Sequence, residues 1–196
     1  MTKLMTPFQR HVSKWHDCVA CPLHKTRQNV VFCRGSLPAD ICFVGEAPGP
    51  SEDVIGKPFI GPAGELLDDI VETVLGNFVL NLRVCFTNLV CCIPLEAGSG
   101  SKFAEPPDES VRACRPRLEE FLKIARPRLI VAVGVSARDW FDKKRRDPVD
   151  AGDAEVIDIV HPAAILRASA AQQDMAIRRA AIQIAVAVQE VFTHAS

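Results

Sequence analysis

Four short runs of β-branched and apolar residues constrain the fold of this chain more than any other feature. They cover residues 40–45, 84–88, 129–134 and 156–160, and their length and composition are typical of buried strands. Helical patterns lie between the first three runs and after the last. Strands that alternate with helices form right-handed crossovers and a parallel sheet covered on both faces. We therefore predict an α/β fold, a three-layer α/β/α sandwich around a central, mainly parallel four-stranded sheet.

Three segments have the apolar periodicity of amphipathic helices. The first ends at Gly76, and the second begins near Pro107 and contains Pro116, which should kink it. The third covers about residues 171–192. The inward faces predicted for them are Leu66, Leu67, Ile70, Val71, Val74 and Leu75, then Val111, Cys114, Leu118, Phe121 and Leu122, then Ile177, Ala181, Ile184, Ala185, Val188 and Val191.

The length of 196 residues, with 48% apolar and 24% charged residues, fits one well-buried domain, residues 1–196. The first 17 residues mix charged and apolar side chains and do not resemble a signal peptide. No later run is long and uncharged enough to span a bilayer. We expect a cytoplasmic protein without a membrane partner. The net charge of -1 neither favours nor excludes nucleic acid, because binding depends on local patches.

Polar residues follow the predicted strands where each strand ends. Glu46 lies in the loop after the first strand, Asn88 ends the second, and His161 follows the fourth. The carboxyl ends of parallel strands meet at one edge of a sheet, where ligands usually bind. Each residue has two interpretations. Glu46 either belongs to a simple turn or is a catalytic carboxylate, and Asn88 either caps a turn or binds the edge of a nucleobase. His161 is either a structural residue or a hydrogen-bond donor to an oxygen that gains negative charge.

The loop after the first strand carries further candidates. Glu52 and Asp53 add a second carboxylate pair, and Phe59 stands between residues rich in Gly and Pro. An aromatic side chain in such a loop is either a plug of the core or a stacking platform for a planar base, a contact worth about 1 to 3 kcal/mol.

Eight cysteines in a reducing compartment indicate metal ligands and buried thiols rather than disulfides. Cys18 and Cys21 form a Cys-x-x-Cys pair, and Cys92 and Cys114 follow far downstream. Together they could hold zinc or an iron-sulfur cluster, and the spacing alone chooses neither the metal nor between Cys91 and Cys92 as third ligand. The cysteines in or beside apolar strands read as buried thiols: Cys33, Cys42 and Cys85.

Six motifs in order resemble the iron-sulfur uracil-DNA glycosylases, the family-four branch of that superfamily, over nearly the whole chain. A single motif would be weak, but an ordered set is specific. The motifs are Cys18-x-x-Cys21-Pro22-Leu23 with Arg27; Gly45-Glu46-Ala47-Pro48-Gly49 with Glu52-Asp53; Gly56-x-Pro58-Phe59-Ile60-Gly61-Pro62-Ala63-Gly64-x-Leu66-Leu67; Thr87-Asn88 with Cys92-x-Pro94; Cys114-x-Pro116-x-Leu118; and His161-Pro162 with Leu166-Arg167.

This resemblance implies a structural [4Fe-4S] cluster on Cys18, Cys21, Cys92 and Cys114. The third ligand would be Cys92, because the family's ligand follows the motif asparagine by four residues. Cys91 then stands where the family commonly has Lys, which removes one expected phosphate contact.

The resemblance also implies the roles of the pocket residues. Phe59 would stack on an extruded uracil and Asn88 would bond its pairing edge, while Gly45, Ala47 and Glu52 would complete the substrate pocket. His161 would stabilise negative charge on the departing base. Glu46 would position the attacking water or stabilise positive charge on the sugar.

The expected function is hydrolysis of the N-glycosidic bond of uracil in single- or double-stranded DNA, by a monomer. The alternatives are a non-catalytic uracil-DNA-binding protein, a relative that traps DNA covalently through a loop histidine, and a zinc-stabilised protein acting on a small molecule. The segment between Cys92 and Cys114 contains no histidine, which argues against trapping. The basic run 143–146, with Arg167, Arg178 and Arg179, reads as a solvated face that could touch phosphates.

Overall fold

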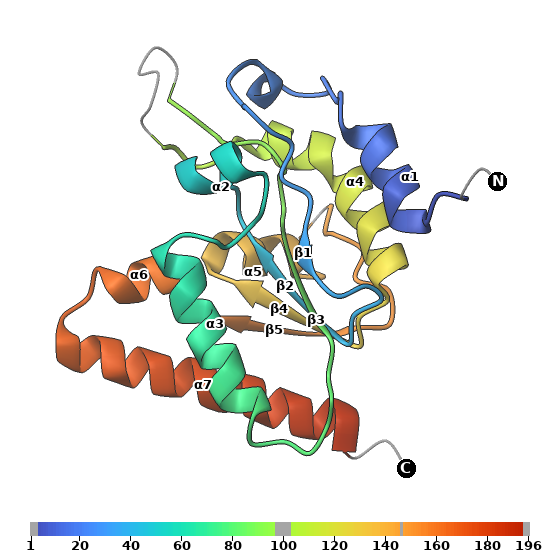
Figure 1. Cartoon of the computed structure of the whole chain (residues 1–196). Coiled ribbons are helices and arrows are strands. Elements are labelled where there is room, and N and C mark those ends of the chain that lie inside the picture. Colours follow the sequence, from blue (N-terminus) through green and yellow to red (C-terminus); the bar gives the residue numbers. More distant parts are fainter. Residues whose placement is uncertain (1–3, 97–102, 146, 194–196) are drawn as a thin grey trace.

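The computed structural model describes residues 4–96, 103–145 and 147–193 and is built around one twisted sheet (Figure 1). Neighbouring strands are parallel except β1, which pairs antiparallel with β3. The order across the sheet is β1-β3-β2-β4-β5. The strands are β1 (Arg34–Gly35), β2 (Ile41–Gly45), β3 (Val84–Asn88), β4 (Leu129–Val133) and β5 (Glu155–Ile159).

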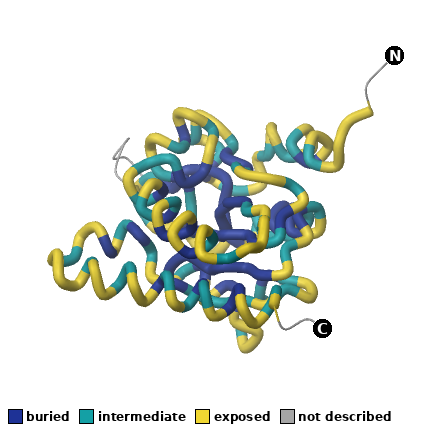
Figure 2. The backbone as a smooth tube through the Cα atoms, turned by 60° about the horizontal axis from the view of Figure 1, so that its bottom comes forward, coloured by how far each residue is buried: buried dark blue, intermediate teal, exposed yellow. Residues whose placement is uncertain are grey.

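Helices cover both faces of this sheet (Figure 1). On one face α4 (Asp108–Ala125) and α5 (Val135–Phe141) pack on the strands, with α1 (Pro7–Trp15) against α4. On the other face lie α3 (Pro62–Leu75) and α7 (Ala170–Thr193). Successive strand residues point to opposite cores, because side chains alternate along a strand: Ile41 and Phe43 face α3 and α7, whereas Cys42 and Val44 face α4. The predicted three-layer sandwich is confirmed, and Figure 2 shows its buried centre beneath more exposed helices.

The sheet has one strand more than the four predicted. The additional β1 contains only two residues, so it carries no periodicity that a sequence could reveal. Four short helices were also missed: α1, α2 (Pro50–Ile55), α5 and α6 (Pro162–Leu166), as was the turn of 3-10 helix η1 (Pro22–Lys25). The helices with long apolar periodicity were placed correctly, and α4 continues through Pro116.

The apolar face predicted for α7 is only partly buried. Ile184 and Val188 are fully enclosed, whereas Ile177, Ala181 and Val191 are half-buried against the same core. Two other apolar residues of this helix, Ile182 and Val186, are exposed. No helix among the described residues is long and apolar enough to cross a membrane.

The segment before the sheet is fixed by two polar links. The carboxylate of Asp53 accepts hydrogen bonds from the backbone N–H groups of Gln28 and Asn29. The ring of His11, only 1% exposed, bonds Glu120 of α4 at 3.0 Å. These bonds hold the cysteine-bearing N-terminal segment against the body of the fold.

Candidate functional site

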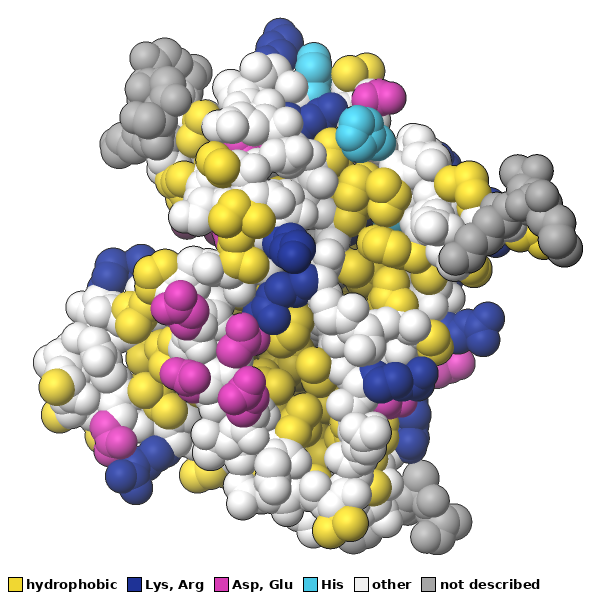
Figure 3. Space-filling view, in the orientation of Figure 1, with side chains coloured by type: hydrophobic (Ala, Val, Ile, Leu, Met, Phe, Trp, Pro, Cys, Tyr) yellow, Lys and Arg dark blue, Asp and Glu magenta, His cyan; other side chains and the backbone are white. Residues whose placement is uncertain are grey.

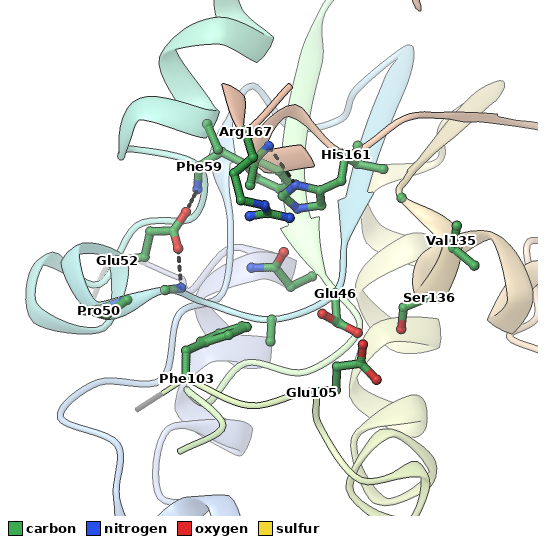
Figure 4. Close-up of a pocket in the computed structure, with 17 residues that line it drawn as sticks. Glu46, Pro50, Glu52, Phe59, Phe103, Glu105, Val135, Ser136, His161 and Arg167 are labelled. Carbon is green, nitrogen blue, oxygen red and sulfur yellow. Dashed lines mark hydrogen bonds between the residues drawn. The ribbon is translucent and has the colours of Figure 1, made fainter. Parts of the chain in front are cut away.

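An open pocket of about 520 Å³ lies at the carboxyl ends of the strands (Figure 4). The strand order reverses beside β2, since β3 lies on one side of it and β4 on the other. Such a switch point is where open α/β sheets bind ligands. The polar and aromatic residues that line it are Glu46, Glu52, Phe59, Asn88, Phe103, Glu105, Ser136, His161 and Arg167.

Phe59 occupies the wall of this pocket in an unusual backbone conformation. Its φ is 55°, a left-handed value that costs a non-glycine residue energy. The loop is held from both sides. Glu52 accepts a hydrogen bond from the Phe59 N–H at 2.6 Å and another from Gly49, and Arg34 donates to the Phe59 carbonyl at 3.0 Å. The ring of Phe59 packs in the core and also lines the pocket.

Asn88 ends β3 with its side-chain amide buried at the pocket. Only 2% of the residue is exposed, and no acceptor among the described residues bonds its Nδ2. A buried amide donor without a partner is unfavourable, which points to a ligand that completes it. Gly45 lies directly behind, because a Cβ there would stand 2.5 Å from Asn88 Oδ1 and 2.5 Å from Phe59 Cζ.

His161 caps the N-terminus of α6, and this bond fixes its tautomer. Its Nδ1 accepts a hydrogen bond from the N–H of Ala163 at 3.1 Å, so the proton of the neutral ring resides on Nε2. Burial lowers the pKa of His161, and the nearby charge of Arg167 lowers it further. The ring is therefore neutral at pH 7 and still offers one N–H donor.

Glu46 faces two other oxygen-bearing side chains, Glu105 and Ser136 (Figure 4). Burial raises the pKa of Glu46, the charge of Glu105 raises it further, and a hydrogen bond from Ser136 opposes both effects. A carboxylate with a raised pKa in a cleft is a candidate for acid-base chemistry.

Most of the predicted pocket residues are brought together. Glu46, Ala47, Glu52, Phe59, Asn88 and His161 all line the pocket, whereas Gly45 lies behind its wall. The carboxylate of Glu52 is occupied by the loop backbone, so its observed contacts are structural.

Sequence reasoning missed Phe103, Glu105 and Ser136 as pocket residues. Ser136 follows the end of β4, a position that the strand-end rule could have found. Phe103 and Glu105 belong to a loop whose path no local pattern predicts.

The cysteines meet elsewhere, in a separate small cavity. All four predicted ligands line it: Cys18, Cys21, Cys92 and Cys114, together with Cys91, Trp15, Arg27 and Arg117. No three His, Cys, Asp or Glu side chains within the described ranges are gathered closely enough to hold a single metal ion. The cysteines expected to be simple thiols are in strands or beside them, with Cys42 and Cys85 fully buried and Cys33 half-buried.

Two arginines reach the sulfur atoms of this cavity. Arg27 lies 3.4 Å from Cys92 Sγ, and Arg117 lies 3.6 Å from Cys114 Sγ. A hydrogen bond from Cys91 lowers the pKa of Cys114 well below its ordinary range, and Arg117 lowers it further against the effect of burial. Burial raises the pKa of Cys92 to about 11, although its contact with Arg27 opposes this effect. Arg27 and Arg117 are thus the positive charges that face the sulfur atoms of the cavity.

The surface charges near the pocket are unevenly distributed. Figure 3 shows acidic side chains gathered over α3, whose carboxylates are Glu65, Asp68, Asp69 and Glu72. Within the predicted basic run, Arg145 pairs with Asp108 and stacks on Trp140, so this member is engaged within the fold. Arg146 lies outside the described residues.

Comparison with known proteins connects this fold to one superfamily. Residues 32–183 match the model of the uracil DNA glycosylase superfamily. The chain is 36% identical to the type-4 uracil-DNA glycosylase of Thermotoga maritima over 76% of its length and 78% of the relative. It is 36% identical to that of Pyrobaculum aerophilum over 82% and 87%. A match at 37% identity to that of Saccharolobus solfataricus covers 65% of this chain and 55% of the relative.

Proposed function

Because this chain belongs to the uracil-DNA glycosylase superfamily, we propose that it hydrolyses the N-glycosidic bond of uracil extruded from DNA and leaves an abasic site. The observation that carries the proposal is the pocket itself. Residues from four strand ends and one loop converge there: Glu46, Asn88, Ser136, His161 and Phe59. A base within a duplex cannot reach such a pocket, so the enzyme must extrude it.

Recognition of uracil is assigned to Phe59 and Asn88. The ring of Phe59 offers a face for stacking, and the Nδ2 of Asn88, which bonds no acceptor in the described part of the chain, can donate to the O4 of uracil. The amide oxygen can accept from N3–H of the same base. Cytosine presents the opposite pattern at both atoms, so this amide orientation rejects it.

Cleavage leaves negative charge on the departing uracil and positive charge on the sugar. His161 donates from Nε2 to the O2 of uracil, in the manner of an oxyanion hole, and needs no additional proton to do so. Glu46, which lines the same pocket, positions the attacking water or stabilises the positive charge that develops on the sugar.

A [4Fe-4S] cluster on Cys18, Cys21, Cys92 and Cys114 is part of the proposal. In such a cluster each cysteine binds its own iron, so four thiols lining a common cavity fit it better than they fit a single zinc ion. The bound cluster would crosslink the N-terminal segment to the exit of β3 and to α4. No reaction step requires it.

We propose one domain spanning residues 1–196 that acts as a monomer in the cytoplasm, where reducing conditions preserve the thiolates. The partner is uracil-containing DNA, single- or double-stranded.

The test is incubation of the purified protein with a uracil-containing oligonucleotide. Free uracil and alkali-labile abasic sites should appear together with repeated turnover, and a matched thymine oligonucleotide should release nothing. A denaturant-resistant protein-DNA band without free uracil would instead support covalent trapping. Tight binding without base release would support the non-catalytic alternative.

A further inference from the structure

Arg117 is a buried arginine to which the proposed reaction gives no role. Only 2% of it is exposed. It lies on α4 three residues after Cys114, so both side chains project from one face of the helix. The motif Cys114-x-Pro116-x-Leu118 leaves its position open. A guanidinium removed from water is costly unless its donors and its charge are matched, so its contacts indicate its purpose.

The guanidinium of Arg117 holds the exit of β3. Its Nη2 donates to the carbonyls of Asn88 at 2.8 Å and Leu89 at 2.9 Å, and its Nη1 lies 3.3 Å from Oγ1 of Thr87. Both adjacent carbonyls are bonded by this one nitrogen, and a planar guanidinium fixes the direction of its N–H groups. The backbone that carries the Asn88 amide is therefore held directly by Arg117.

The opposite side of the same backbone is held by β2. The N–H of Leu89 donates to the Gly45 carbonyl at 2.9 Å, and the N–H of Val90 donates to the Glu46 carbonyl at 3.1 Å. The β3 exit thus lies between the loop that carries Glu46 and the side chain of Arg117. If Arg117 is removed, the carbonyls of Asn88 and Leu89 lose this donor, whereas the bonds on the β2 side remain.

The charge of Arg117 is directed to the cysteine cavity. No carboxylate in the described part of the chain forms an ion pair with it, and Cys114 Sγ lies 3.6 Å from its Nη2. The two N–H groups of Nη2 are thus shared among three acceptors: the carbonyls of Asn88 and Leu89 and the sulfur of Cys114, one of the proposed ligands. One side chain thereby bridges two sites that otherwise lie in separate cavities.

We propose that Arg117 is a positioning residue that links the cysteine centre to the end of β3 and holds the Asn88 amide in register with extruded uracil. The inference deepens the proposed function and rests on it. A displacement of a substrate-reading group by about 1 Å is enough to lower a rate by about 100-fold.

The test is a double-mutant cycle between Arg117 and Asn88, measured as single-turnover uracil release. Arg117→Met should lower kcat/KM by about 10- to 100-fold in the wild-type background. In the Asn88→Ala background the same change should cost less than about twofold, because the amide that Arg117 positions is already absent. The matched control is Arg115→Met, two residues away on α4. The wild-type Arg115 side chain donates to the Asp147 carbonyl, and its replacement should leave activity unchanged in both backgrounds.

A second measurement tests the contact between Arg117 and the sulfur of Cys114. With the cluster bound, Arg117→Met should shift its reduction potential to more negative values, because a buried cation stabilises the added electron. Arg117→Lys keeps the positive charge but lacks the planar guanidinium that bonds the two carbonyls. Its reduction potential should therefore be close to that of the wild-type protein, whereas its kcat/KM should remain low. If Arg117→Met does not yield folded protein, the double-mutant cycle with Asn88→Ala is measured with Arg117→Lys instead.

Equal losses in the two backgrounds would overturn the link to Asn88, as would full activity of a folded Arg117 variant. An unchanged potential in Arg117→Met would overturn the link to the cysteine centre. These failures differ from failure of the proposed function, which would appear as no uracil release by the wild-type protein.

Discussion

The backbone N–H of Phe59 donates to Oε1 of Glu52 at 2.6 Å, and this bond holds an aromatic ring whose backbone is in a left-handed conformation. Arg34 holds the same residue from its carbonyl side at 3.0 Å. Strain of this kind persists only where the surroundings over-determine it. The position of the Phe59 ring in the pocket therefore depends on two charged residues, Glu52 and Arg34.

Replacing Glu52 with Ala should therefore weaken uracil binding. We expect KM to rise about tenfold and the free energy of unfolding to fall by about 1.5 to 3 kcal/mol, since a charge-assisted hydrogen bond is lost. Steady-state kinetics and chemical denaturation measure the two effects. Glu72→Ala, at an exposed site on α3, is the control and should change neither. An unaltered KM in Glu52→Ala would contradict the role assigned to this bond.

Gly45→Ala tests the close packing behind the pocket. Its Cβ would stand 2.5 Å from both Phe59 Cζ and Asn88 Oδ1, so at least one of these groups must move. We expect kcat/KM to fall by about 100-fold. Gly61→Ala is the matched change, because a Cβ there meets no atom within 4 Å, and it should cost less than about 1 kcal/mol of stability. Similar activities of the two variants would be inconsistent with this packing.

His161→Ala should lower kcat by about 100- to 1,000-fold, the usual cost of losing one oxyanion donor. Iron content should remain unchanged, because His161 does not line the cysteine cavity. His16→Ala, at an exposed histidine of the N-terminal segment, provides the control. Full activity of His161→Ala would require another donor to the departing base.

The pH dependence of uracil release should reveal the neighbours of Glu46. If ionised Glu46 is the active form, kcat/KM rises with pH through its raised pKa. Glu105→Gln removes a like charge, so the pKa of Glu46 should fall and the acid limb should move to lower pH. Ser136→Ala removes a hydrogen bond that stabilises the ionised form, so the limb should move to higher pH.

His161 and Arg167 also line this pocket and are retained in both variants, so their contributions are unchanged. Shifts in the same direction for Glu105→Gln and Ser136→Ala would show that Glu46 does not govern the acid limb.

Cys91 and Cys92 provide a test of the cluster's register. Cys92→Ala should lose most of its iron, measured together with sulfide and with absorbance near 400 nm, whereas Cys91→Ala should retain it. Both residues are buried, so the loss of a buried thiol is common to both variants. The reverse outcome would make Cys91 the third ligand. A colourless wild-type protein containing zinc after anaerobic preparation would exclude the cluster.

The local sequence pattern was sufficient to predict those strands and helices whose structure is determined by one continuous segment. Apolar residues recur with the period of a buried strand or of a one-sided helix in the elements that were predicted. These are the strands β2, β3, β4 and β5 and the helices α3, α4 and α7. The strand-end rule then placed Glu46, Asn88 and His161 at one edge of the sheet, since parallel strands must end there together. Short elements such as β1 and α6 carry no such signal and were missed.

By itself, the sequence determined the layer architecture, the edge of the sheet that holds the pocket and several of the residues that line it. Only the tertiary structure decided what surrounds them. Glu105 beside Glu46, Arg34 behind Phe59 and Arg117 beneath Asn88 all come from distant segments. The physical reason is that hydrogen bonding and charge act through space, whereas periodicity is a property of neighbours along the chain. Tertiary contacts therefore set the strain, the protonation and the position of groups whose identity the sequence had already shown.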